Sequence, residues 1–401
     1  MRALVFSEDI MSETKTEVEL TAAPLNKEII PELIHAGGPC ITLLLPPYRP
    51  GEPNETTAAQ LKGELQQAAK DLSARRTAEP LTATLLEPLY QLSEDKSSLT
   101  GSHLDRVIFR SEGIFRQFAL PVPASRARPC SVGDCFWIRP IFSALALPEH
   151  TYVLELTKEA VTLLACGFTE VTRVELPVGT PETLDDALGF KAPDHKLVNR
   201  SSAGPSVGAM RGVQFGTGSG RETEHSYLHD FYRAIDRGVK ELLHSTQAPL
   251  ILAGVGEDVA IYRAINTYSN LLEQGIQGSP GVKSSPTRIL RHVHDITLFD
   301  FQRRAALAMS ASKERLAPAR FSTDLESILR TAAEGRVSDL YLDENVQRMG
   351  NFDGKRFGGR ANWHDEDLMN VGAVETLLHG GAVYSLPSHL MTGPIAAAIR
   401  Y

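Results

Sequence analysis

The stretch from residue 208 to residue 244 reads GAMRGVQFGTGSGRETEHSYLHDFYRAIDRGVKELLH and joins a glycine-rich segment to a regularly patterned one. Thirteen positions hold five glycines: Gly208, Gly212, Gly216, Gly218 and Gly220. Glycine lacks a side chain and adopts backbone conformations that other residues avoid, so this run predicts a flexible loop that can approach a partner closely.

An amphipathic helix is predicted directly after this loop. Its apolar residues recur at spacings of three and four and therefore share one face; they are Leu228, Phe231, Tyr232, Ile235, Val239 and Leu242. A simple linker between domains does not need a flexible loop that is followed by a rigid helix. We therefore expect the loop to contact a partner.

The composition is that of an ordinary globular protein. The chain has 401 residues, of which 42% are hydrophobic and 22% charged, and this length favours two or three domains. The net charge of −8 argues against a broad nucleic-acid-binding surface, and nothing indicates DNA as a partner. The oligomeric state is left open.

The cysteines and the apolar runs indicate the compartment. Four cysteines without CxxC spacing favour reduced thiols; they are Cys40, Cys130, Cys135 and Cys166. The first twenty residues resemble no signal peptide, and no apolar run approaches the roughly 20 residues of a membrane span. We expect a cytoplasmic protein without a membrane partner.

Three α/β domains are predicted, over residues 1–148, 149–282 and 283–401. In the first, the pattern predicts helices from Thr57 to Arg76 and over Pro80–Leu92, and strands at Cys40–Leu45, Arg106–Arg110, Ile114–Leu120 and Cys135–Pro140. No residues there have catalytic spacing, which favours a structural or docking role.

The middle domain is predicted to contain a mixed sheet. Three strands in a row form an antiparallel meander at one edge; they are Tyr152–Leu156, Val161–Ala165 and Val171–Leu176. A short strand at His195–Val198 precedes the loop. A buried strand at Pro249–Ala253 and a helix over Gly256–Ser269 follow the long helix. The acid pair Glu257–Asp258 stands at the start of that helix, where negative charge favours the helix dipole.

The last domain is predicted to be a small α/β/α sandwich. Ser322 or Thr323 caps one helix, and Gly335 ends it. The remaining elements are helices over Leu298–Ser312 and Leu368–His379, and strands at Val337–Leu342, Ala382–Leu386 and Ile395–Arg400. His292 and His294 alternate, which favours a strand that places both on one face.

Neither a metal nor an organic cofactor is predicted. His225 and His229 have the spacing of metal ligands on a helix, but no third ligand stands nearby. The glycine-rich run precedes a helix, as a phosphate-binding loop does, yet no lysine follows it as in GxxxxGK[ST].

A basic segment lies between Lys283 and Arg320, where eight basic and three acidic residues give a net charge of +5. We single out Arg288, Arg291, Arg303 and Arg304 as a candidate patch. Two interpretations stay open: the patch binds RNA phosphate, or it is a solvated face that pairs with acids elsewhere.

Several stretches resemble one protein family. DLESILRTAAEGRVSDLYLDEN (residues 324–345), AVETLLHGGAVYSLP (373–387) and the terminal AAAIRY resemble the third domain of archaeal and eukaryotic class I release factors and of Pelota. VLELTKEAVTLLACG (153–167) resembles the strand pair that opens their middle domain. The chain resembles the bacterial archaeo-eukaryotic-type release factor families, over residues 150–401.

This resemblance implies three α/β domains. The middle one would be ribonuclease-H-like without nuclease carboxylates, and the C-terminal one would be an L7Ae-like α/β/α sandwich. It also implies that the protein engages ribosome and tRNA, with possible hydrolysis of the peptidyl-tRNA ester in termination or ribosome rescue. The alternative is a non-catalytic adaptor of the Pelota type that binds RNA or protein.

The glycine-rich loop takes the place of the peptide-release loop, whose tip in release factors is Gly-Gly-Gln. In this chain the corresponding sequence is Gly212-Val213-Gln214. Valine cannot reach glycine's positive-φ conformations without strain. Either Gln214 is still the functional glutamine, or the tip is Gly216-Thr217-Gly218-Ser219-Gly220 with Arg221. A catalytic tip would use loop amides with Gln214 or Thr217 to orient water.

Overall fold

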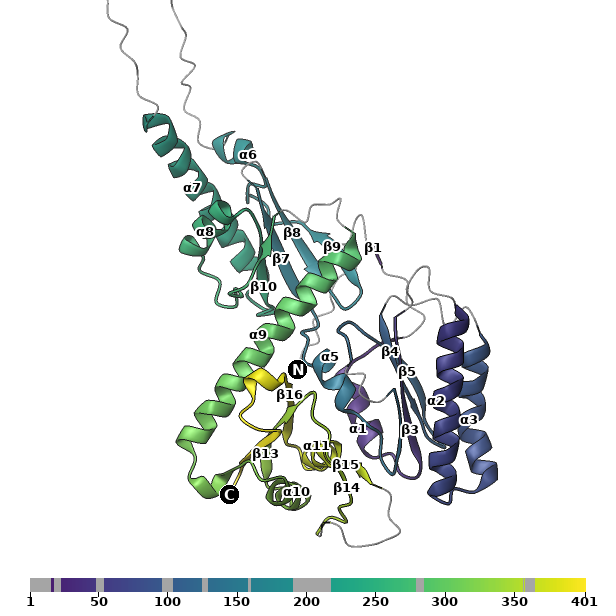
Figure 1. Cartoon of the computed structure of the whole chain (residues 1–401). Coiled ribbons are helices and arrows are strands. Elements are labelled where there is room, and N and C mark those ends of the chain that lie inside the picture. Colours follow the sequence, from purple (N-terminus) through teal and green to yellow (C-terminus); the bar gives the residue numbers. More distant parts are fainter. Residues whose placement is uncertain are drawn as a thin grey trace, which may run out of the picture. The chain divides into compact units, whose positions relative to one another are not determined.

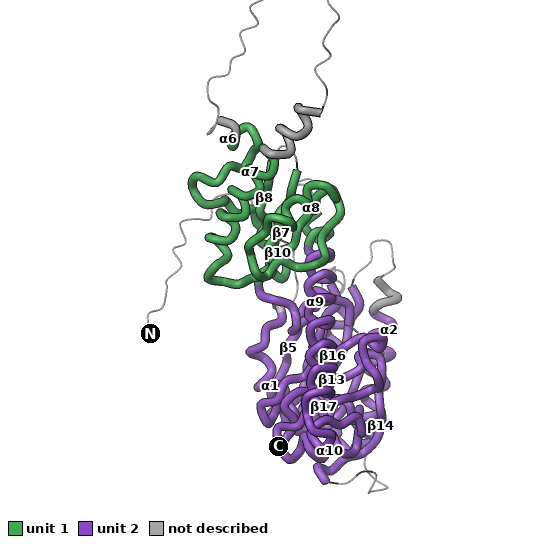
Figure 2. The backbone as a smooth tube through the Cα atoms, turned by 90° about the vertical axis from the view of Figure 1, so that its left-hand side faces the viewer, with its two compact units in different colours: residues 1–16, 150–289 green, residues 17–149, 290–401 purple. Residues whose placement is uncertain are grey.

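A computed structural model shows the arrangement of the chain (Figure 1). It describes residues 16–17, 23–47, 54–95, 104–124, 129–157, 160–189, 218–278, 285–355, 357 and 365–401. The chain forms two compact units (Figure 2): residues 1–16 with 150–289 make unit 1, and residues 17–149 with 290–401 make unit 2. The boundaries predicted at residues 148 and 282 stay a prediction.

Unit 1 is built on a six-stranded mixed sheet with the order β1-β9-β8-β7-β10-β11. β7, β8 and β9 form the antiparallel meander, and β10 runs parallel to β7. The strand bounds are β1 Thr16–Glu17, β7 Thr151–Leu156, β8 Val161–Cys166, β9 Glu170–Val174, β10 Leu250–Gly254 and β11 Ile276–Gln277. The predicted meander on one side of a mixed sheet is confirmed.

Three helices lie wholly within the described part of unit 1: α6 (Leu184–Gly189), α7 (Gly218–Leu243) and α8 (Gly256–Ile265). The apolar face of α7 joins the core formed by β7, β8, β10 and α8. The strand predicted at His195–Val198 lies outside the described residues.

The described part of unit 2 contains two larger sheets and one strand pair, and the first sheet has the order β2-β5-β4-β3-β6. Helices α2 (Asn54–Ala74) and α3 (Glu79–Glu94) share an apolar core with β3 and β4. The other bounds are α1 Ile30–Ile34, β2 Ala23–Pro24, β3 Cys40–Leu45, β4 Asp105–Arg110, β5 Phe115–Leu120, β6 Cys130–Gly133 and the 3₁₀ turn η2 Lys27–Ile29.

The strand predicted at Cys135–Pro140 is wrong. The strand is β6 instead, and the chain then turns into a 3₁₀ helix η3 (Arg139–Ile141) and a short helix α5 (Phe142–Leu145). Pro140 has no N–H to give to a sheet and its fixed φ suits the start of a helix. The Ile138 N–H is also occupied, because it donates to the side chain of Asn370 at 2.9 Å.

The second sheet of unit 2 has the order β12-β17-β13-β16 and lies between two layers of helix (Figure 1). Gly372 of α11 lies near Leu329 of α10 and Leu340 of β13, whereas α9 places Ala305 and Met309 in one cluster with Tyr341. Because neighbouring strand residues point to opposite faces, this is the predicted α/β/α arrangement. The bounds are α9 Pro286–Arg315, α10 Leu325–Ala333, α11 Leu368–Leu378, β12 Phe321–Ser322, β13 Val337–Asp343, β16 Ala382–Leu386 and β17 Ile395–Ile399.

Unit 2 also contains several short elements. They are the strand pair β14 (Met349–Gly350) and β15 (Glu366–Asp367), and the 3₁₀ turns η4 (Pro318–Arg320) and η5 (Ser388–Leu390).

The helix predicted from Leu298 begins twelve residues earlier, at Pro286. His292 and His294 therefore lie on helix α9, and the strand predicted for them is wrong. The deciding pattern is the buried set Ile289, Leu290, Val293 and Thr297, which recurs at spacings of three and four. Pro286 suits the first helical position because its missing N–H would have no helical partner there.

The cap predicted at Ser322 or Thr323 is also wrong by one or two residues. Asp324 is the N-cap of α10, and its carboxylate accepts a hydrogen bond from the Ser327 N–H at 2.8 Å. Gly335 ends the helix as predicted, with φ of 73°.

Replacing Asp324 with Ala should lower the free energy of unfolding by about 0.5–2 kcal/mol, because the Ser327 N–H loses its acceptor. Chemical denaturation measures this change. Thr323→Ala is the matched control and should have little effect; an equal loss in both variants would contradict the assignment of the cap.

Candidate functional site: helix α7 and its surroundings

The predicted partner-binding loop is only partly described. Gly212, Gln214, Gly216 and Thr217 lie outside the described residues. Gly218, Gly220 and Arg221 were predicted in the loop, but the backbone of helix α7 already begins at Gly218. Glycine costs a helix only about 1 kcal/mol relative to alanine, which the buried remainder of a 26-residue helix offsets.

Helix α7 is held in unit 1 by its apolar face. Phe231, Tyr232, Ile235, Val239 and Leu243 are at most 1% exposed. The predicted Leu242 is only partly buried and packs at the margin of this core. The helix that leads away from the glycine-rich segment is therefore a fixed support.

A buried carboxylate on this apolar face ties α7 to the segment after α8. Asp236 is 3% exposed and accepts hydrogen bonds from the Thr267 N–H at 3.0 Å and the Thr267 hydroxyl at 2.7 Å. The pKa of Tyr262 is raised, first by burial and then by the negative charge of Asp236. The phenol stays neutral at physiological pH.

A second carboxylate lies on α8. Asp258 is fully buried in the first turn of that helix. Burial raises the pKa of Tyr232 on α7, and the nearby charge of Asp258 raises it further. Tyr232 on α7 and Tyr262 on α8 also contact each other edge to face, with ring centroids 6.0 Å apart, in the core of unit 1.

Gly238 allows α7 to approach the loop before α6. A Cβ atom at residue 238 would lie 2.4 Å from the Thr180 hydroxyl oxygen.

Asp236 and Gly238 were not predicted from the sequence. The signal for Asp236 was available, because it lies three or four positions from Tyr232 and Val239 and therefore on the apolar face.

No metal site is found in the part of the chain that the structure describes, where no three His, Cys, Asp or Glu side chains are grouped to hold an ion. Among the same residues, no helix is both long and apolar enough to cross a membrane.

All four residues of the basic patch lie on α9. Arg303 and Arg304 approach the carboxylate of Asp300 at 3.3 Å and 2.7 Å, so pairing with an acid accounts for part of their charge. Arg288 and Arg291 are exposed. The charge of Arg291 acts on the nearby Asp295 carboxyl group, whose pKa is raised by burial and lowered in part by this charge. Both interpretations of the patch stay open.

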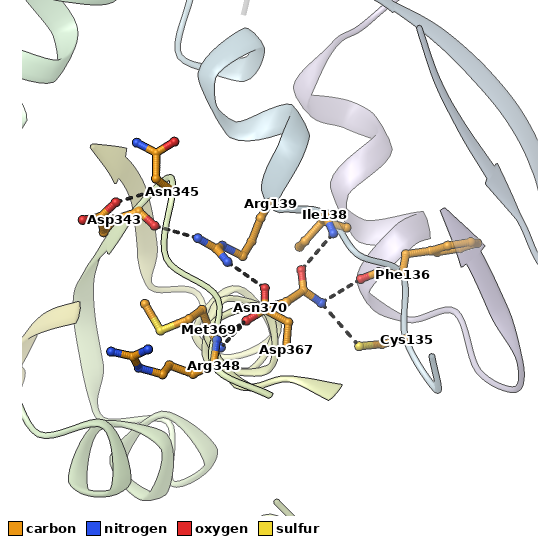
Figure 3. A network of polar contacts seen from close by, with 10 residues as sticks. All are labelled: Cys135, Phe136, Ile138, Arg139, Asp343, Asn345, Arg348, Asp367, Met369 and Asn370. Atoms are coloured by element: carbon orange, nitrogen blue, oxygen red, sulfur yellow. Dashed lines mark hydrogen bonds and ion pairs between the residues drawn. The ribbon is translucent and has the colours of Figure 1, made fainter. Parts of the chain in front are cut away.

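A buried polar network in unit 2 was not predicted (Figure 3). The Arg139 guanidinium donates to the Asp367 carboxylate at 2.6 Å and to the Asp343 carbonyl at 2.7 Å. Arg139 and Asp367 are 7% and 8% exposed. This ion pair connects the segment after the first sheet to the start of α11.

Two more residues near the start of α11 extend the network. The Asn370 amide accepts from the Ile138 N–H and donates to the Phe136 carbonyl, both at 2.9 Å. Glu366 accepts from the Asp134 N–H at 2.7 Å, and burial raises its pKa although Arg75 lies 3.4 Å away. The partners are more than 200 residues apart in the chain, so no local pattern reveals them.

Residues 150–336 match the model of the bacterial archaeo-eukaryotic release factor family 3, which confirms the predicted resemblance over this range. The matched range contains the glycine-rich segment, α7, α8 and α9. No curated protein matches the chain.

Solved structures of related type give low similarity. An archaeal translation termination factor aRF1 is 14% identical, covers 93% of this chain and 96% of its own, and gives a TM-score of 0.25. Archaeoglobus fulgidus Pelota is 13% identical over 75% of this chain and 80% of its own, with a TM-score of 0.31. Dom34 of S. cerevisiae is 11% identical over 72% and 74%, with a TM-score of 0.32. At these scores the likeness says nothing about function.

Proposed function

We propose that this protein acts in translation in the cytoplasm by engaging the ribosome and a tRNA. The match of residues 150–336 to a release factor family is the observation that carries the proposal. Helix α7 supports it, because its buried apolar face and the hydrogen bonds from Thr267 to Asp236 hold the helix that follows the glycine-rich segment.

The more specific form of this function is hydrolysis of the peptidyl-tRNA ester in termination or ribosome rescue. Backbone amides of the segment, with Gln214 or Thr217, would orient the attacking water, and Arg221 would contact RNA phosphate. This chemistry depends on positioning, so it uses no metal and no organic cofactor.

The alternative is a non-catalytic adaptor of the Pelota type, which one observation favours. Val213 stands where release factors have the second glycine of Gly-Gly-Gln. A β-branched residue restricts the backbone that must bring the glutamine to the ester. An adaptor needs the same supporting helix but no hydrolytic tip.

An assay of peptidyl-tRNA hydrolysis, with and without ribosomes, separates the two forms. If the protein is a hydrolase, Gln214→Ala should lower the rate by about 100–1000-fold, the range for loss of a group that stabilises the reacting atoms. Thr217→Ala and a Gly216→Ala/Gly218→Ala double variant test the alternative, in which the tip of the loop is the segment from Gly216 to Gly220. Retained ribosome binding without hydrolysis in any form, wild type included, would establish the adaptor.

The basic patch gives a second prediction. Removing Arg288 and Arg291 together should weaken binding to ribosomal RNA and reduce the slope of log K against log salt by roughly one to two, because up to two phosphate contacts are lost. Arg330→Ala, on the exposed side of α10, is the control and should leave the slope unchanged. Salt-independent binding would exclude a role for the patch.

A further inference from the structure

Helix α3 contains a proline in its interior. Pro88 lies inside this 16-residue helix, well beyond its first turn. A proline has no N–H to donate to the carbonyl of the residue four positions before it, and its ring presses against that carbonyl. In α3 this carbonyl belongs to Thr84. The helix therefore needs a donor from elsewhere if the Thr84 carbonyl is to stay hydrogen-bonded.

The neighbouring sheet supplies that donor. The Arg110 guanidinium, at the end of β4, donates from Nη2 to the Thr84 carbonyl at 2.7 Å and from Nε to the Leu85 carbonyl at 3.3 Å. Both bonds meet α3 in the turn that precedes Pro88. The rigid fork of N–H groups in a guanidinium can reach two adjacent carbonyls, whereas the ammonium of lysine is a single point.

The strand pattern places Arg110 on the face that α3 covers. Ile108 of β4 belongs to the apolar core that this sheet shares with α2 and α3, and side chains two residues apart on a strand point to the same side. Figure 1 shows α2 and α3 beside this sheet. Arg110 is only 9% exposed, so its guanidinium lies where the pattern alone would favour an apolar side chain.

The buried charge of Arg110 has no carboxylate partner among the described residues. Its contacts there are the two helix carbonyls and the ring of Phe115, whose centroid lies 5.9 Å from the guanidinium carbon. Burial lowers the pKa of Arg110, but an arginine in a protein stays protonated. A buried cation is costly unless it is hydrogen-bonded, so the carbonyls of α3 explain why an arginine is stable at this position.

We propose that Arg110 fixes the conformation of helix α3 by supplying the hydrogen bond that Pro88 removes. The proline makes the helix depend on the sheet. Without the guanidinium, the Thr84 carbonyl has no donor, and the part of α3 before the proline, residues 79–87, opens more often as a local unit. This pairing lies outside the family match at residues 150–336 and does not rest on the proposed function.

A double-mutant cycle in the full chain tests this dependence. Arg110→Met removes both donors and should lower the equilibrium constant for folding of unit 2 by roughly 10–150-fold, the range for hydrogen bonds to a charged group. Pro88→Ala returns an N–H to the Thr84 carbonyl. In the Pro88→Ala chain, the same Arg110→Met change should therefore cost at least about tenfold less. Denaturant unfolding measures all four chains.

The matched control is Arg116→Met on the next strand, β5. The Arg116 side chain is 49% exposed and pairs with Glu32 at 2.9 Å. Its removal should have a small effect, equal with Pro88 and with Ala at that position.

Hydrogen exchange locates the change. Backbone amides of residues 82–87 should exchange faster in Arg110→Met than in the parent chain, and they should regain protection in the Arg110→Met/Pro88→Ala chain. Amides of β3 and β4 should keep more of their protection than those of α3.

Two results would overturn the proposal. Equal effects of Arg110→Met with and without Pro88 would show that the guanidinium does not compensate for the proline. Faster exchange in β3 and β4 without a larger change in α3 would show that Arg110 supports the sheet instead. If Arg110→Met does not fold, Arg110→Lys keeps the charge with a single donor point and is compared in the same two backgrounds, with the same two criteria. Ribosome binding does not enter the measurement, so failure of the proposed function leaves this result unchanged.

Discussion

Replacing Arg139 with Ala is expected to lower the free energy of unfolding of unit 2 by about 3–5 kcal/mol. The substitution leaves the Asp367 carboxylate buried, with no cation among the described residues to balance it. It also removes the donor to the Asp343 carbonyl. Denaturant unfolding gives the free energy, and hydrogen exchange of the β13 and β17 amides localises the loss.

Two further variants decide whether the buried charge is the cause. Arg330→Ala breaks the half-exposed ion pair with Glu326 and should change the free energy of unfolding by no more than about 1 kcal/mol. An Arg139→Met/Asp367→Leu double variant removes both charges and should recover much of the lost stability, since apolar replacements of buried pairs are often neutral or stabilising. A double variant as unstable as Arg139→Ala would contradict this explanation.

Phe231→Ala should destabilise unit 1 by about 3–5 kcal/mol, the usual cost of truncating a buried phenylalanine. Phe231 is 1% exposed and belongs to the core that α7 shares with β7, β8 and β10. The loss should appear as faster hydrogen exchange in β7 and β10, while β13 and β17 keep their protection.

The control for this variant lies on the opposite side of the same helix. The Arg233 side chain is 65% exposed and only loosely paired with Asp230, at 3.9 Å, so Arg233→Ala should change stability by less than about 0.5 kcal/mol. If Phe231→Ala is as mild as Arg233→Ala, helix α7 is not held by its apolar face, and the rigid support assumed for the proposed function is absent.

Local patterns predicted most of the helices and strands. The meander of unit 1 and the apolar face of α7 follow from periodicities of two and 3.6, because each segment buries one face. Two of the errors occurred where a single contact outweighs a short pattern. Pro140 and the hydrogen bond from Ile138 to Asn370 replace a predicted strand, and Asp324 competes with two neighbouring residues for the cap.

The position of the candidate site could be predicted from the sequence, but the buried contacts that hold helix α7 in place could not. The glycine-rich segment and the resemblance directed attention to residues 208–244, and the family match includes them. Asp236 accepts a hydrogen bond from Thr267, and Gly238 leaves room for Thr180; both partners are distant in the chain. The Arg139–Asp367 pair joins residues that lie 228 positions apart, so only the folded chain brings it together.

The central claim is that this protein engages the ribosome, and co-sedimentation of the full chain with purified ribosomes tests it most directly. We predict that the protein pellets with ribosomes at low salt, and that both raised salt and the Arg288→Ala/Arg291→Ala change reduce the bound fraction. A folded protein that stays in the supernatant at every salt concentration, with empty ribosomes and with ribosomes carrying peptidyl-tRNA, would contradict the claim.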